Sequence, residues 1–289
     1  MTAGPQATSP PFSEPVPGRF SPLPRIIWHD DFSRGLQGWT GLIGNYEGSL
    51  DAMLPGFRDL RPPMLSNATM WDTGSAGAAN GIYAMKLATR PETGGLAVGI
   101  KRDTWRTQGK IQLEAIVTFK PEASELVLSE LDVRAIGVLF DLQDAEHRVM
   151  PHLRYLNAWE GQPVARWQYK EGRVPLRDIG TSGKTRSHFH LSPEGWIDLP
   201  GEPQPLCYNE IATKQNWHYL RVSFDLETMS FDGFRCNDRT YDVSGVRPMV
   251  LPAMANLWCM LNMAFWAETD RDKRAFLYVD SVVLSAEGD

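Results

Sequence analysis

The sequence predicts an all-β protein built as a sandwich of two antiparallel sheets. Three observations support this prediction: short runs with alternating apolar and polar residues recur along the chain, clusters of Gly, Pro, Asn and Asp separate them, and no segment keeps a helical period over several turns. About a dozen such runs with frequent turn residues are typical of a two-sheet sandwich.

Size and composition fit one sandwich domain and exclude several kinds of partner. The 289 residues are 42% hydrophobic, enough to bury a core, and we expect residues 25–289 to form a single domain. A formal net charge of −6 and a pI near 5.6 provide no basic surface for nucleic acid. No apolar run reaches the ~18 residues of a membrane helix, so no membrane association is expected.

Residues 1–24 are predicted to be a tail or strap that lies across the surface. Proline removes backbone donors and favours extended chain, and the segment contains few apolar groups. Its seven prolines are Pro5, Pro10, Pro11, Pro15, Pro17, Pro22 and Pro24.

From residue 25 onward, strands are expected wherever period-2 apolar runs occur. The first is residues 26–32 (IIWHDDF) and the last is 274–285. The runs between them are 82–88, 95–101, 110–119, 133–142, 147–157, 163–170, 217–226, 229–236 and 256–267. Residues 121–131 are the one place where a helical turn is expected, and the Gly- and Pro-rich segments 40–80 and 171–215 are expected to be loops.

The two terminal strands resemble the opening and closing strands of jelly-roll sandwiches in the concanavalin-A-like lectin and glucanase superfamily. Each sets an acidic residue among apolar and aromatic ones. The central chain resembles uncharacterised bacterial single-domain members, through residues 130–134 (ELDVR), 140–144 (FDLQD), 153–157 (LRYLN), 217–222 (WHYLRV) and 237–245 (NDRTYDVSG). This resemblance implies a jelly roll in which the first and last strands pair, and a carbohydrate as the class of ligand.

The segment Glu130-Leu131-Asp132 also resembles the start of the catalytic ExDxxE strand of retaining glucanases in that superfamily. Retention needs two carboxyl groups about 5 Å apart. Arg134 and Ala135 stand where the last glutamate belongs, so the motif lacks its general acid.

Two groups of residues are candidate metal ligands. Asp30, Asp31 and Asp280 are oxygen donors that pairing of the terminal strands would bring together, as at a structural calcium site. His188 and His190 flank one residue, so in a strand both rings would point to the same side and chelate a transition metal.

The strongest binding candidate is a predicted hairpin over residues 147–170. A three-residue turn at 160–162 would pair Arg154 with Gln168 and His152 with Lys170. His152, Arg154, Arg166 and Gln168 would then share an outward face of a concave sheet, suited to a carboxylate or a row of sugar hydroxyls. Loop-region tryptophans that could stack on a sugar ring are Trp71, Trp105, Trp159 and Trp196.

The sequence therefore predicts a carbohydrate-binding or carbohydrate-active sandwich, with an acidic glycan as the expected ligand. Two alternatives stay open: a polysaccharide lyase or glycoside-processing enzyme using His and Arg groups, with or without a metal, and an interaction module without a small ligand. The three cysteines form no metal or disulfide pattern. Without a signal peptide the chain as given is expected in the cytoplasm, or outside the cell if a leader was removed.

Overall fold

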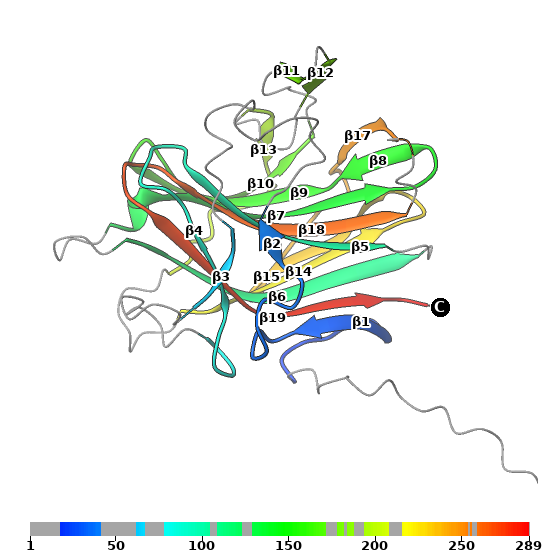
Figure 1. Ribbon diagram of the computed structural model, residues 1–289, viewed down its shortest axis with the longest axis horizontal. Helices are drawn as coiled ribbons and strands as arrows, with labels where there is room; N and C mark the ends of the chain where they lie inside the picture. The colour runs from blue at the N-terminus through cyan, green and yellow to red at the C-terminus, as the bar shows by residue number, and fades with distance from the viewer. Residues whose placement is uncertain are drawn as a thin grey trace, which may run out of the picture.

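The computed structural model is an all-β sandwich, shown in Figure 1. It describes residues 18–41, 62–66, 78–104, 109–122, 129–171, 178–181, 184–187, 194–207, 216–253, 255 and 259–288. Within these residues the secondary structure consists of strands and a 3-10 turn at Glu130–Asp132, which overlaps the end of residues 121–131, where a helical turn was expected. No helix in the described part of the chain is long and apolar enough to span a membrane.

One layer is an eight-stranded antiparallel sheet that contains both terminal strands. Its order is β16 (Arg239–Tyr241), β15 (Ser230–Cys236), β14 (His218–Asp225), β6 (Lys110–Pro121), β19 (Ala275–Ala286), β4 (Met85–Ala88) and β3 (Met64–Leu65), with β1 (Arg25–Asp30) also paired to β19.

The other layer is a nine-stranded sheet. Its order is β13 (Trp196–Asp198), β10 (Gln162–Lys170), β9 (His152–Trp159), β7 (Val133–Gln143), β18 (Met260–Thr269), β5 (Leu96–Thr104) and β2 (Thr40–Gly41), with β8 (His147–Met150) paired to β7 and to β17 (Met249–Pro252). A separate two-stranded sheet joins β11 (Asp178–Thr181) to β12 (Lys184–Ser187).

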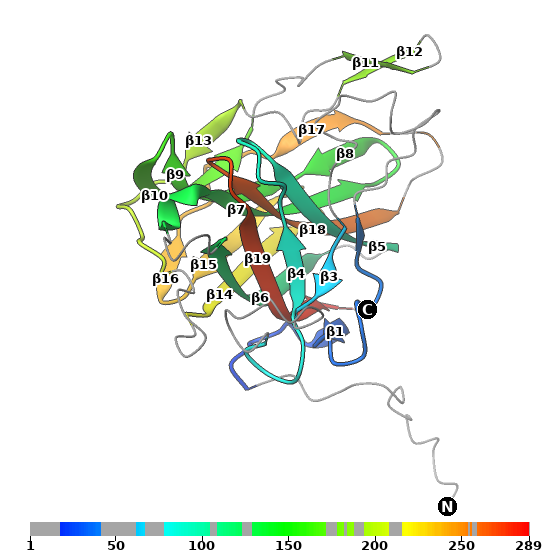
Figure 2. The same cartoon turned by 60° about the vertical axis from the view of Figure 1, so that its left-hand side comes forward.

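The terminal strands lie side by side, which confirms that prediction. β1 runs antiparallel to β19, with Asp30 opposite Val282 and Arg25 opposite Ala286. Figures 1 and 2 both show the C-terminus next to β1.

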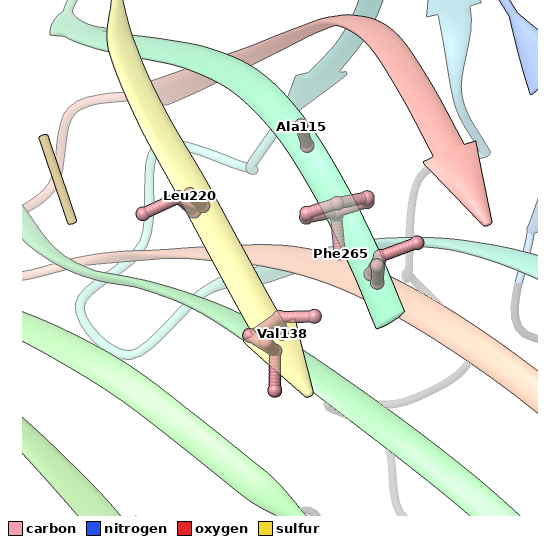
Figure 3. Close-up of a pocket in the computed structure, with 6 residues that line it drawn as sticks. Ala115, Val138, Leu220 and Phe265 are labelled. Carbon is pink, nitrogen blue, oxygen red and sulfur yellow. The ribbon is translucent and has the colours of Figure 1, made fainter. Parts of the chain in front are cut away.

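The core lies between the two sheets because alternate residues of the central strands point inward. In β6 these are Leu113, Ala115 and Val117, and they pack with residues such as Val138 and Phe265 of the opposite sheet. The close-up in Figure 3 shows part of this contact. The small gap there is lined by six apolar side chains and is closed to water, so it is a packing feature and holds no ligand.

Most predicted strands are confirmed, and the differences have local causes. The expected strand 147–157 is divided at Pro151 into β8 and β9, because proline has no N–H for the sheet ladder. The short strands β2, β3, β11, β12 and β13 lie in the segments 40–80 and 171–215 that were expected to be loops, and β17 was not predicted either. All three cysteines are free: Cys236 is buried, Cys259 is half-buried and Cys207 is exposed.

Residues 1–17 of the proline-rich segment lie outside the described residues. Residues 18–24 are described, and Phe20 among them is buried against Ile116 and Val283. These contacts lie on the outer face of the eight-stranded sheet, since the neighbours of Ile116 in β6 face the core.

Candidate functional site

The hairpin β9–β10 positions the predicted binding residues. A two-residue turn, Glu160-Gly161, joins the strands with φ of 51° and 73°, and a bulge follows at Ala165, where φ is 56°. The predicted three-residue turn is thus replaced by a shorter turn and a bulge. The extra residue of the bulge restores the register, so Arg154 still lies opposite Gln168, as predicted.

The turn is held by the buried carboxylate of the residue that follows β18, a strand separated from β9 by β7. Asp270 accepts hydrogen bonds from the backbone N–H of Glu160 at 3.2 Å and of Gly161 at 2.7 Å. Gly161 has a φ of 73°, a backbone conformation that favours glycine because it has no Cβ.

The face predicted from the alternation is the outer face of the nine-stranded sheet. Leu153, Tyr155 and Trp167 point into the core, which leaves the alternate residues of β9 and β10 on the other side. The structure differs from expectation in exposure: His152, Arg154 and Gln168 are buried rather than open to solvent.

Two tryptophans account for this burial. The indole of Trp196, on the edge strand β13, lies 4.2 Å from the Arg154 guanidinium and 4.5 Å from the His152 ring. Trp266 of β18 lies 5.6 Å from the His152 ring and 6.0 Å from Trp196. Aromatic rings and a guanidinium are therefore buried next to one another on this outer face, an arrangement that favours cation–π contacts.

Trp266 can lie across the sheet because the strand beside it has a glycine. Gly137 of β7 is directly opposite Trp266 of β18. A Cβ there would lie 2.2 to 2.4 Å from three atoms of the indole. The Trp266 Nε1 group is buried and has no hydrogen-bond partner in the described part of the chain.

Arg154 is the central cation of this face. Its Nε donates to Gln168 Oε1 at 2.7 Å, and Gln168 Nε2 in turn donates to Asp198 at 2.7 Å. The closest carboxylate oxygen, from Glu268, is 4.0 Å from its Nη1. Burial lowers the pKa of Arg154 to about 10, partly offset by Glu268 and reinforced by Arg134.

Glu268, in β18, forms its ion pair with Arg134 of the adjacent strand β7. Arg134 donates to Glu268 at 2.8 Å and to Asp270 at 2.7 Å. Burial nevertheless raises the pKa of Glu268, against the lowering effect of Arg134 and Arg154. The guanidinium of Arg134 also lies 4.7 Å from the ring of Trp159, a side chain that is 39% exposed.

Lys170 and Arg166 complete the polar side of β10. Lys170 is buried with its Nζ 5.0 Å from the Trp196 ring, and burial together with Arg154 lowers its pKa to about 7. Arg166 is partly exposed and donates to the Gly201 carbonyl at 3.0 Å.

Candidate oxygen ligands of a calcium ion each have separate partners. Asp280 accepts from the backbone N–H groups of Ala79 and Asn80, at 2.9 and 2.7 Å. Asp30 accepts from Trp39 Nε1 at 2.9 Å and from Lys101 Nζ at 2.5 Å.

Asp31 accepts from the backbone N–H of Ser33 at 3.0 Å. Among the described residues, no three His, Cys, Asp or Glu side chains gather as a metal site. His188 and His190 lie outside the described residues, as do Trp71 and Trp105.

The resemblance of residues 130–132 to the start of a catalytic glucanase strand is not matched by a strand at that position. Glu130–Asp132 is a 3-10 turn before β7, and Asp132 lies 3.4 Å from Lys273 Nζ. Sequence reasoning also missed Arg134, Glu268 and Trp266 as members of the site. A signal existed for Trp266, because a glycine in the middle of an apolar strand marks a close approach.

Comparison with solved structures gives distant likenesses. The Emp47p carbohydrate recognition domain is 10% identical, with 84% of this chain and 100% of that chain covered and a TM-score of 0.40. The T. cruzi calreticulin globular domain is 10% identical, with 90% of this chain and 88% of that chain covered and a TM-score of 0.40.

A structure from work on endo-acting O-glycanases of the human gut microbiota is 11% identical, with 91% of this chain and 100% of that chain covered and a TM-score of 0.40. No curated protein sequence matches the chain significantly. A family model does match, over residues 11–288. The chain therefore belongs to the family described as Domain of unknown function (DUF6772).

Proposed function

We propose that this protein binds a carbohydrate, and specifically a sugar acid, on the outer face of the nine-stranded sheet. The observation that carries the proposal is the incomplete pairing of Arg154. Its Nε is used by Gln168, but its terminal N–H groups make no hydrogen bond in the described part of the chain. A planar guanidinium in this state fits the two oxygens of a carboxylate.

The surroundings of Arg154 suit the rest of a sugar. Trp196 lies over the guanidinium and offers an apolar ring face next to it. Trp159, at the end of β9, the strand that contains Arg154, is 39% exposed. Indoles bind the apolar faces of flat partners, so the carboxylate would lie at Arg154 and a neighbouring ring would stack on an indole.

Binding requires Trp196 to move. Arg154 is only 5% exposed, and the indole that covers it belongs to a three-residue edge strand. An edge strand this short is held by few ladder hydrogen bonds, so its displacement costs little compared with that of a central strand. A ligand carboxylate would then compensate the buried charge of Arg154.

Calorimetric titration tests the proposal, with glucuronate- and galacturonate-containing oligosaccharides compared with their neutral counterparts. We expect only the acidic members to bind. Arg154→Met should weaken binding about tenfold or more, because a charge-assisted pair contributes about 1.5–3 kcal/mol. Arg154→Lys should recover part of the loss, since an ammonium cannot make the two-pronged contact.

Arg148→Met is the matched control. Arg148 lies in the same sheet, but both of its bonds to Asp141 are already made, at 2.7 Å each. Gln168→Glu supplies a second test, because it places an internal carboxylate beside Arg154 and should block binding. Equal affinity for acidic and neutral sugars, or loss of binding in the Arg148 variant alone, would contradict the proposal.

The enzyme alternative depends on His188 and His190 and predicts turnover of an acidic polysaccharide. An unsaturated product that absorbs in the ultraviolet would indicate a lyase. If the protein binds no sugar and turns none over, the remaining hypothesis is an interaction module without a small ligand.

A further inference from the structure

A buried hydroxyl group at the end of β18 is surrounded by carbonyl oxygens. Thr269 Oγ1 lies 3.0 Å from the carbonyl oxygen of Asp132, the residue before β7. It also lies 2.9 Å from the carbonyl oxygen of Arg271 and 2.5 Å from that of Lys273, both in the loop between β18 and β19. A hydroxyl has one hydrogen and makes one well-aligned hydrogen bond. At least two of the three contacts therefore bring oxygen atoms together without such a bond.

The carboxylate of Asp132 adds a negative charge at this place. Asp132 is 2% exposed, and its Oδ2 atom has no hydrogen-bond partner in the described part of the chain. The ammonium of Lys273 is 3.4 Å away, beyond normal hydrogen-bond length, and that side chain is 32% exposed. Covalent geometry keeps Oδ2 within about 5 Å of the carbonyl oxygen of the same residue, which contacts Thr269. A buried carboxylate in this state is costly unless a further positive charge compensates it.

The oxygens gathered here are those that calcium prefers. Calcium takes six to eight oxygen ligands, including carboxylates and backbone carbonyls, at 2.3–2.6 Å. Ligand oxygens in such a shell stand about 3 Å from one another, close to the spacing around Thr269 Oγ1. Magnesium keeps several waters and is seldom held by a cage of protein oxygens, and transition metals favour nitrogen or sulfur.

We propose that a calcium ion binds at the end of β18. Its ligands are the hydroxyl oxygen of Thr269, the carbonyl oxygens of Asp132, Arg271 and Lys273, and the Asp132 carboxylate. Backbone carbonyls supply most of this set, so no group of acidic side chains marks the site. The ion joins the start of β7 to the loop between β18 and β19. That loop also carries Asp270, which holds the turn of the β9–β10 hairpin.

Equilibrium dialysis of the metal-depleted, full-length protein against calcium chloride tests the proposal. We expect one calcium ion per chain, with a dissociation constant of about 0.1–1 mM because the site has one carboxylate. Magnesium chloride should bind at least tenfold more weakly. Calcium at ten times its dissociation constant should raise Tm by about 2–5 °C, since the unfolded chain has no such site.

Two variants locate the ion, and a third is the matched control. Thr269→Val removes one ligand and Asp132→Asn removes the charge, so each should weaken calcium binding at least tenfold and remove the Tm rise at that concentration. Thr89 also has a buried hydroxyl, which accepts from the backbone N–H of Ala275 at 2.8 Å. Thr89→Val should therefore lower Tm and keep the calcium-dependent rise.

The results separate this site from the terminal-strand carboxylates and from a structural role of Thr269. A calcium-dependent rise that is kept in Asp280→Asn and lost in Asp132→Asn supports the proposal, even if Thr269→Val does not fold. Absence of bound calcium in the intact chain, as expected if water occupies the position, would overturn it. So would an undiminished rise in Asp132→Asn, or a rise that is lost in Asp280→Asn or Thr89→Val. None of these outcomes bears on sugar binding by Arg154.

Discussion

Replacing Gly137 by alanine tests whether the arrangement of Trp266 over the nine-stranded sheet is correct. The added methyl would lie 2.2 to 2.4 Å from three indole atoms, against the 3.4 Å or more of ordinary contact, so the ring must shift by about 1 Å or leave its position. Overpacking of this kind costs about 1–3 kcal/mol. The same shift disturbs His152 and Trp196, which pack on the indole.

Urea unfolding followed by tryptophan fluorescence measures the cost. Gly233→Ala is the matched control, since Gly233 is also a strand glycine, but its added Cβ would meet only Ser223 at 3.9 Å. We expect this control to leave stability unchanged or slightly raised. If Gly137→Ala and Gly233→Ala unfold at the same urea concentration, the close approach of Trp266 to β7 is wrong.

Three further predictions concern buried charges. Arg134→Met should destabilise the fold by about 3–5 kcal/mol in chemical unfolding, because it leaves Glu268 and Asp270 buried without their partner; a loss below about 1 kcal/mol would contradict the network. The pKa of Lys170 lies near 7, below its unfolded value, so its contribution to stability is present above pH 10.5 and lost as the pH falls through 7; Lys170→Met should flatten the stability profile between these limits. Burial raises the pKa of Asp280 to about 6, so its contribution to stability is present below pH 3.8 and lost as the pH rises through 6. The variant Asp280→Asn keeps an acceptor for the two N–H groups and should raise Tm at pH 8 but not at pH 4. If the Asp280 carboxylate binds calcium, added calcium should raise Tm only in the unmutated chain.

The fold was predictable from sequence because strands with one face in the core show their period directly. The strand over residues 110–121, at the centre of one sheet, follows the alternation closely, since Ile111, Leu113, Ala115, Val117 and Phe119 all belong to the core. The register of the β9–β10 hairpin was also predictable, since a slip of one residue would send Arg154 into the core and Leu153 out of it.

The burial of the candidate site was not predictable. It depends on Trp196, which comes from a three-residue strand without a period of its own, and on Trp266, whose position depends on a glycine in another strand. Alternation also says which side a residue faces, but not whether another segment covers that side. For the same reason the packing of Phe20 and Ser21 over Glu114 could not be foreseen from the pattern of β6.

The central claim is that Arg154 binds the carboxylate of a sugar, and a crystal structure with an acidic oligosaccharide tests it most directly. We expect the sugar carboxylate within about 3 Å of the terminal nitrogens of Arg154, with Trp196 displaced from its present position 4.2 Å from the guanidinium. A sugar bound on another surface, with Trp196 and the Arg154–Gln168 hydrogen bond unchanged, would contradict the claim.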